Sequence, residues 1–294
     1  MTVTSGPSSA TALERNRPIG ADELRAKADW IRLETIRLID QAGLGHYSST
    51  FSCAEALAVL YYHALRLDPA DPSWPERDRF LLGKGHVAVG QWPILAELGY
   101  FPTAWLDGYG RLGSPLTDHP DMRKVPGVDF SSGSLGHNLS VGVGMGLAQR
   151  LRHGDARVFV LTGDGELQEG QVWEAAMSAS HYRLGNLVAV LDANGFSGGG
   201  ATSVTLNIEP LADRFAAFGW TTVEVDGNDV EALVRTFDAL PDPSGDRPVC
   251  VVSRTRKGAG LAAMEAAPQA WHLGHMTEDE RAAARAEIEA RMAR

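Results

Sequence analysis

The sequence predicts an α/β fold in which helices cover both faces of a parallel β-sheet. Two short, continuous apolar runs, Arg157–Leu161 and Leu187–Leu191, are typical of strands that are buried on both faces. A helical pattern from Gln171 to Tyr182 separates them. Apolar strands that alternate with helices form parallel sheets, so these segments define the centre of the fold.

The N-terminal part is expected to contain a tail and three helices. Residues 1–20 are rich in Ser, Thr, Ala and Pro and lack the apolar core of a signal peptide, so we expect a disordered tail. Apolar residues recur at helical spacing from Asp22 to Gln41. A second helix is expected from Cys53 to Leu65, with Ser52 as its N-terminal cap, and a third from Gln91 to Leu98.

The rest of the chain is expected to form a single domain over residues 21–294, because no linker-like change of composition follows the tail. The segment Thr103–Ser134 is dense in Gly, Pro and Asp, and a loop of this length usually serves function or flexibility. Small residues line the helix expected from Asn138 to Leu151, which allows close packing on a sheet or on a second subunit. The other expected elements are strands at Thr222–Val225 and Val249–Ser253 and helices at Glu209–Phe218, Val230–Leu240 and Thr277–Ala293.

The composition excludes several classes of function. With 294 residues the chain is long enough to bury a sizeable core, and its net charge of -10 argues against nonspecific nucleic-acid binding, which depends on Lys and Arg. No apolar run reaches membrane-spanning length, so we expect no membrane partner and a cytoplasmic protein. Cys53 and Cys250 match no metal or redox spacing and are expected to be small buried side chains.

Polar side chains follow the two central strands, at the point where each strand ends. Asp164 follows the first strand and Asn194 follows the second. Open parallel sheets bind ligands beyond the carboxyl ends of their strands, and oxygen ligands suit Mg²⁺. A carbonyl after Asn194, such as that of Phe196, can add a third ligand, while Gly163 and Gly165 let the backbone approach phosphates. Each cluster alone is also a common turn signal, so the prediction rests on the pair.

The paired clusters resemble the metal and diphosphate motif of thiamine diphosphate enzymes. The continuation Glu166–Gly170, followed by Trp173–Ala175, resembles transketolases in particular. The other matching segments, in the same order along the chain, are Gly45-His46, Gly83–His86, Asp118–Pro120, Pro126–Asp129, Gly133–Gly136 and Trp271-His272. The resemblance runs from about Leu24 to His275 and implies the thiamine diphosphate-binding fold.

The resemblance also implies a cofactor and a set of ligands. The cofactor is thiamine diphosphate, bound through Mg²⁺ or through Ca²⁺ or Mn²⁺ in its place. The implied ion ligands are Asp164, Asn194 and the carbonyl of Phe196. The implied cofactor contacts are Gly133, Ser134 and Leu135 beside its rings, and His86, Gly165, Glu166, Asn194 and His272 toward the diphosphate. For Leu135 alone, a place in the core is an equal alternative.

Four residues are implied to act in catalysis. His46 and His119 resemble histidines that line the substrate channel, where they can stabilise oxyanions or move protons. His272 is a catalytic candidate as well as a diphosphate ligand. Glu169 resembles an acidic residue that lies at the subunit interface and couples two active sites; the alternative is a solvated glutamate at a helix start.

Full-length transketolases are more than twice as long and carry a pyrimidine-binding domain and a C-terminal domain after this region. The resemblance therefore implies the N-terminal subunit of a split transketolase, expected as an α2β2 assembly with a C-terminal partner and inactive alone. Its substrates would be sugars or sugar phosphates, between which a two-carbon ketol unit is transferred. The alternatives are a 1-deoxyxylulose-5-phosphate synthase, the α subunit of a 2-oxo-acid dehydrogenase, and a non-catalytic paralogue. The departures from the family pattern are Asn138, Leu273 and Gly198–Gly200, which leave the ion ligands intact.

Overall fold

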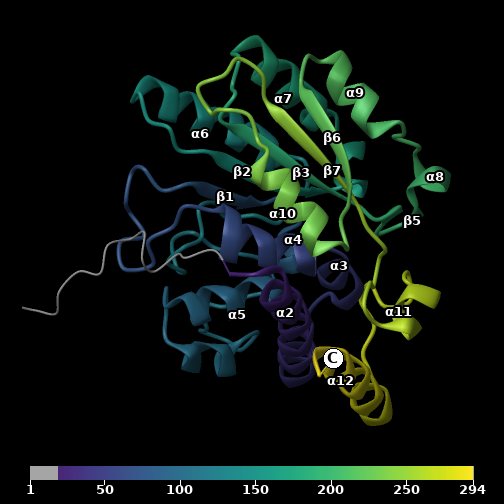
Figure 1. The fold of residues 1–294 in the computed structure, drawn as a ribbon. Coiled ribbons are helices and arrows are strands. Elements are labelled where there is room, and N and C mark those ends of the chain that lie inside the picture. The colour runs from purple at the N-terminus through teal and green to yellow at the C-terminus, as the bar shows by residue number, and fades with distance from the viewer. Residues whose placement is uncertain (1–18, 294) are drawn as a thin grey trace, which may run out of the picture.

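The computed structural model of the chain describes residues 19–293, so the expected tail, except for Ile19 and Gly20, lies outside the described residues. Its centre is a five-stranded sheet with the order β1-β2-β3-β7-β6, in which every pair of neighbours is parallel (Figure 1). The strands are β1 (Arg79–Leu82), β2 (Val158–Gly163), β3 (Leu187–Ala193), β6 (Thr221–Asp226) and β7 (Val249–Arg254). The predicted fold class is confirmed.

Helices cover both faces of this sheet, as Figure 1 shows above and below the strands. One face packs against α2 (Ala21–Ala42), α4 (Ala54–Val59), α5 (Ala88–Leu98) and α10 (Val230–Asp238). The other face packs against α6 (His137–Leu151), α7 (Gly170–His181) and α9 (Leu211–Ala217).

Alternate strand residues serve the two cores, because successive side chains of a strand point to opposite faces. In β2, Phe159 and Leu161 belong to the first core, whereas Val158 and Val160 belong to the second. Burial of a Val, Leu or Phe side chain contributes roughly 1.5–3 kcal/mol. Both faces of the central strands are therefore apolar, which explains why they read as continuous apolar runs.

The register brings the polar strand ends together. Leu82 lies opposite Leu161, and Gly163 lies opposite Asp192, so β1, β2 and β3 end at the same edge. The sequence pattern does not predict the strand β1. Its four residues lie between a charged loop and Gly83, which is too short a run to show a period.

The helix expected from Cys53 to Leu65 is interrupted. The segment begins earlier as α3 (Tyr47–Ser52), continues as α4 and ends in a π-helical turn at Leu60–Ala64. The prediction that Ser52 caps the helix is wrong. Its hydroxyl lies in the last turn of α3 and donates to Asp192 Oδ2 (2.6 Å), and α4 has no side-chain cap.

The long segment Thr103–Ser134 is irregular, as predicted, apart from one 3₁₀ stretch at Thr103–Gly108. A buried ion pair anchors it to the sheet: Arg77 Nη1 donates to Asp129 Oδ2 (3.0 Å), which also accepts from the backbone N–H of Phe80 (2.9 Å). This anchor fixes the chain that leads into Gly133–Gly136.

Small elements complete the fold. They are the hairpin β4 (Phe196–Ser197) and β5 (Gly200–Ala201), and the helices α8 (Thr202–Thr205), α11 (Ala262–Ala266) and α12 (Glu278–Met292). Thr277 caps α12 in a capping box with Glu280. Cys53 and Cys250 are free and buried, as predicted. Within residues 19–293, no helix is long and apolar enough to cross a bilayer.

Candidate functional site

A small pocket lies at the edge of the sheet where β1, β2 and β3 end. It gathers eight of the predicted site residues: His86, Leu135, Asp164, Gly165, Glu166, Asn194, Phe196 and His272. Other residues that line it, to which the sequence analysis assigns no role, include Ser49, Lys84, Ser197 and Lys257. Five predicted site residues, namely His46, His119, Gly133, Ser134 and Glu169, do not line this pocket.

Asp164 joins the two loops that hold the predicted ion ligands. It is 3% exposed and lies at the start of the 3₁₀ turn Gly165–Gln168. Its carboxylate accepts from the N–H groups of Gly165 (2.8 Å) and Gly195 (2.6 Å). Burial, with the nearby charge of Asp192, raises the pKa of Asp164 to about 7. Among residues 19–293, no cationic side chain forms an ion pair with this carboxylate, and a bound cation would supply one.

Asn194 and Phe196 line the same pocket as Asp164. Asn194 Oδ1 accepts from the N–H of Phe196 (3.0 Å), and the carbonyl oxygen of Phe196 lies 3.5 Å from a Cβ built on Gly165. Among residues 19–293, no cluster of three His, Cys, Asp or Glu side chains forms a metal site. One carboxylate, one amide oxygen and one carbonyl instead fit Mg²⁺, which completes its octahedron with water and phosphate oxygens. The residues fit the ion, and their ligand role stays a prediction.

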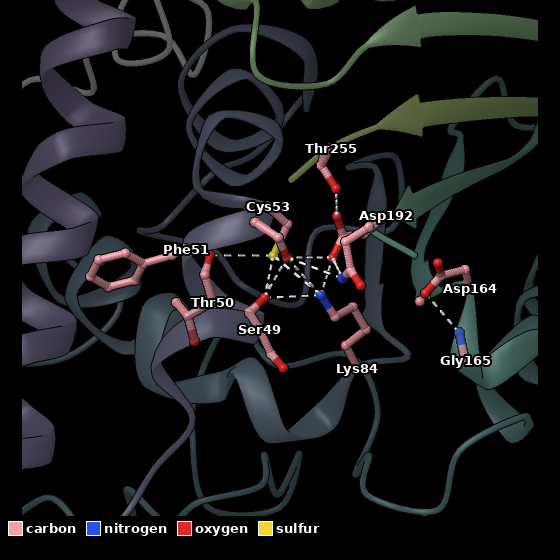
Figure 2. A network of polar contacts seen from close by, with 12 residues as sticks. Ser49, Thr50, Phe51, Cys53, Lys84, Asp164, Gly165, Asp192 and Thr255 are labelled. Atoms are coloured by element: carbon pink, nitrogen blue, oxygen red, sulfur yellow. Dashed lines mark hydrogen bonds and ion pairs between the residues drawn. The ribbon is translucent and has the colours of Figure 1, made fainter. Parts of the chain in front are cut away.

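Behind these ligands lies a buried ion pair between Lys84 and Asp192 (Figure 2). Lys84 Nζ also donates to the carbonyl of Ser49 (2.9 Å), and Asp192 also accepts from Ser52 and Thr255. Burial is the largest single effect and lowers the pKa of Lys84, but the charge of Asp192, its hydrogen bond and the other nearby acidic groups together outweigh burial, so the net shift is upward. The ammonium of Lys84 is therefore occupied inside the protein.

Lys257 is the second buried lysine of the site and has no such partner. It is 4% exposed, and its Nζ lies 5.9 Å from the centre of the Phe196 ring. Within the described part of the chain, no side chain pairs with its ammonium group. Burial, together with the charge of Lys84, lowers its pKa to about 8. A desolvated cation that lines a pocket is suited to an anionic ligand such as a diphosphate.

Three of the predicted histidines form a cluster at this pocket. The ring centroids of His46 and His86 are 4.8 Å apart, those of His46 and His272 are 5.1 Å apart, and those of His86 and His272 are 5.7 Å apart. Burial and the nearby Lys84 lower the pKa of His86 well below its usual range, and burial and Lys257 lower that of His272 to about 4. Both imidazoles are therefore neutral at pH 7.

His119 approaches the site from the long irregular segment. Its Nδ1 lies 3.5 Å from Asp118 Oδ2, and His46 Nδ1 lies 3.7 Å from Asp118 Oδ1. Asp118 thus lies between the two histidines, and the ring of His119 also packs beside Gly133, 3.3 Å from a Cβ built there. The two histidines predicted to contact substrate therefore share one carboxylate.

Glu166 has a structural role through its side chain. Its side chain turns inward, is 2% exposed and accepts from the N–H groups of Gly136 (3.0 Å) and Gly163 (3.3 Å). Burial raises its pKa to about 7. The side chain thus holds two glycine segments in place, while the contact of Glu166 with the diphosphate stays a prediction.

Leu135 and Glu169 are both exposed. Leu135 is 36% exposed and lines the pocket, so the alternative of a core residue is wrong. Glu169 is exposed at the start of α7, and its Cβ lies over Gly136, whose φ of +85° excludes most side chains. Its predicted place at a subunit interface stays a prediction, as does the contact of the exposed Ser134 with the cofactor.

Comparison with known proteins gives a family. Residues 24–291 match the family model described as transketolase, thiamine diphosphate binding domain. The chain is 36% identical over 259 residues to one subunit of the apulose-4-phosphate transketolase of Phocaeicola vulgatus, and the match covers 88% of this chain and 91% of that protein. It is 39% identical over 267 residues to one subunit of the 6-deoxy-6-sulfo-D-fructose transketolase of a Clostridium species, covering 91% of this chain and 96% of that protein.

Longer relatives match as well. The transketolase of Pongo abelii is 38% identical over 250 residues, which is 85% of this chain but only 39% of that protein. The solved transketolase of Leishmania mexicana has a TM-score of 0.77 at 26% identity, over 94% of this chain and 46% of that one. A transketolase from Pichia stipitis in complex with sedoheptulose-7-phosphate has a TM-score of 0.78 at 28% identity, over 93% of this chain and 45% of that one. The chain thus spans about half the length of these solved structures.

Proposed function

The chain belongs to the transketolases, as a subunit that carries the thiamine diphosphate-binding domain, and from this premise we propose that it transfers a two-carbon ketol unit only together with a second subunit. The observation that carries the proposal is the share of each relative's length that this chain matches. The chain covers 91% and 96% of two relatives named as subunits, but 39% of an undivided transketolase. The second subunit would supply the pyrimidine-binding and C-terminal domains, in an α2β2 assembly.

The cofactor of the proposed reaction is thiamine diphosphate with Mg²⁺. When bound, it supplies a nucleophilic carbon that accepts the ketol unit of a ketose and passes it to an aldose. In the proposed roles, Asp164, Asn194 and the Phe196 carbonyl hold the ion, and Lys257 faces the diphosphate. In the same proposal the backbone of Gly165 and Glu166 would lie beside the phosphates, which is supported by the place of both residues in the pocket wall.

The histidines are proposed to act on the sugar and the cofactor. Neutral His86 and His272 can donate one hydrogen bond each to the diphosphate, and His272 also lies 3.1 Å from Ser49 Oγ. His46 and His119 flank Asp118, which can orient both rings toward a donor hydroxyl or a carbonyl oxygen that gains charge. Glu169, exposed beside Gly136, is proposed to meet a second subunit.

The substrates are proposed only as a class. The relatives are named for an apulose phosphate and for a sulfonated fructose, so members of this family act on sugars with an anionic group. We extend this to sugars or sugar phosphates for the present chain. A cytoplasmic location is part of the same proposal.

The test is an assay of ketol transfer with the purified chain, with and without the protein encoded by a neighbouring gene of the pyrimidine-domain type. Transfer that requires both proteins, thiamine diphosphate and Mg²⁺ is the expected result. Strong transfer by the isolated chain would refute the need for a partner. Turnover of pyruvate instead of a ketose would favour a 1-deoxyxylulose-5-phosphate synthase or a 2-oxo-acid dehydrogenase. Failure of Asp164→Ala to weaken cofactor binding would favour a non-catalytic paralogue.

A further inference from the structure

A buried carboxylate lies behind the proposed ion site and does not line the pocket. Asp192 is 1% exposed and lies near the end of β3, two residues before Asn194. Its oxygens accept from the side chains of four residues that come from different parts of the chain, and Figure 2 shows the centre of this network. The four donors are Ser52, Lys84, Asn194 and Thr255.

The contact with Asn194 fixes which end of that amide faces the pocket. A carboxylate paired with a buried ammonium is ionised and can only accept hydrogen bonds. The NH₂ group of Asn194 must therefore face Asp192, and Nδ2 lies 2.8 Å from Asp192 Oδ2. The carbonyl oxygen then points the other way, where it accepts from the N–H of Phe196 (3.0 Å).

The charges behind the site are balanced as well. Lys84 is 4% exposed and Asp192 is 1% exposed, so neither charge is screened by water. Because Lys84 and Asp192 neutralise each other, Asp164 is the charged oxygen ligand of the proposed set. Its neighbour in that set is the neutral amide of Asn194, which is held in one orientation. Groups that orient a metal ligand without touching the metal often change metal affinity by about 10- to 100-fold.

We propose that Asp192 is a positioning residue that holds Asn194 with its carbonyl oxygen toward the cation. The proposal rests on the proposed function, since it assumes an ion held by Asp164 and Asn194. The competing explanation is that Asp192 only ties α3, β1 and β7 together through Ser52, Lys84 and Thr255. That explanation predicts a loss of stability on substitution, with no change in the Mg²⁺ requirement of the folded protein.

The experiment exchanges the carboxylate at position 192 and the amide at position 194, singly and together. The full chain, together with the partner subunit of the proposed function, is titrated calorimetrically with thiamine diphosphate at a series of Mg²⁺ concentrations, and unfolding temperatures of the chain are recorded alongside. Asp192→Asn should raise the half-saturating Mg²⁺ concentration by about tenfold or more, because an amide at position 192 can turn either its oxygen or its NH₂ group toward Asn194 and no longer fixes the orientation of that residue. The double variant D192N/N194D should restore it, since the new amide donates to the new carboxylate and leaves the other carboxylate oxygen for the ion.

The single variant N194D is the control for added charge. It places two carboxylates face to face, so it should bind Mg²⁺ less well than the double variant. If N194D alone equals the double variant, the effect is one of charge and the proposal is overturned. The same holds if D192N keeps the wild-type Mg²⁺ requirement.

Two further measurements cover the remaining cases. If D192N does not fold because Lys84 is left unpaired, the variant K84M is compared with the double variant K84M/D192N. An equal Mg²⁺ requirement of these two variants overturns the proposal. The side-chain amide protons of Asn194 are followed by NMR without cofactor, where slow exchange should be lost in D192N; unchanged exchange overturns the proposal. Absence of cofactor binding by the wild-type chain together with its partner subunit would instead contradict the proposed function, since the NMR comparison does not depend on cofactor binding.

Discussion

Replacement of Lys257 by Met should weaken cofactor binding and yet stabilise the empty protein. Lys257 is 4% exposed, and its ammonium group has no ion-pair partner among the described residues. Its pKa is lowered from 10.5 to about 8 by burial first and by Lys84 second. At about 1.4 kcal/mol for each pKa unit, burial of the charged form costs the empty fold about 3 kcal/mol.

A bound diphosphate would offset much of this cost, because charge-assisted hydrogen bonds contribute about 1.5–3 kcal/mol. The Kd for thiamine diphosphate should therefore rise by about 10- to 100-fold in Lys257→Met at saturating Mg²⁺. The apparent unfolding temperature without cofactor should rise, since methionine carries no charge to desolvate.

Calorimetric titration measures the first effect and thermal unfolding measures the second. Lys124→Met is the matched control, because Lys124 is exposed and its ion pair with Asp121 lies on the surface. It changes the net charge equally and should alter neither quantity appreciably. The reasoning fails if Lys257→Met binds the cofactor as tightly as the wild type, or if it destabilises the empty protein.

Three further predictions concern the ion, the loop anchor and pH. Removal of divalent ions with EDTA should abolish cofactor binding, and Mn²⁺ or Ca²⁺ should restore it; binding that persists in EDTA would contradict the ion site. Asp129→Asn should lower the free energy of unfolding by about 3–5 kcal/mol, because Arg77 is left buried without its partner. The control is Asp155→Asn, because the ion pair between Asp155 and Arg66 is exposed. In urea titrations this control should lower the free energy of unfolding by less than about 1 kcal/mol. The pKa of His272 is about 4 in the folded protein, so between pH 6.5 and 4 this side chain is protonated in the unfolded chain but not in the folded one. The free energy of unfolding should therefore fall as the pH falls through this range. The slope in this range should be smaller in His272→Gln, and an identical slope would show that His272 is not responsible.

The fold could be predicted, and the place of the proposed ion ligands with it, because both depend on short stretches of sequence. The strands β2 and β3 are long apolar runs, and Asp164 and Asn194 follow them directly. The strand β1 could not be predicted because four residues carry no readable period. The capping role predicted for Ser52 is wrong because a hydroxyl before an apolar run is a local signal, whereas its partner Asp192 is 140 residues away.

The parts of the site that the sequence does not reveal depend on long-range pairing. Lys84 lies within a segment that resembles transketolases, but its partner Asp192 is 108 residues further along the chain. Lys257 belongs to no motif, and only its place just after β7 associates it with the same edge of the sheet. The inward turn of the Glu166 side chain follows from the approach of Gly136, which no spacing reveals.

The network around Asp192 also has a consequence for folding. Its donors include residues at positions 52, 84 and 255, so the carboxylate cannot acquire its partners until β1, β3 and β7 have assembled. Contacts between such distant residues form late and slowly. Affinity for the coenzyme should therefore appear only in the last stage of refolding, which makes ligand uptake a reporter of chains that have reached the native topology.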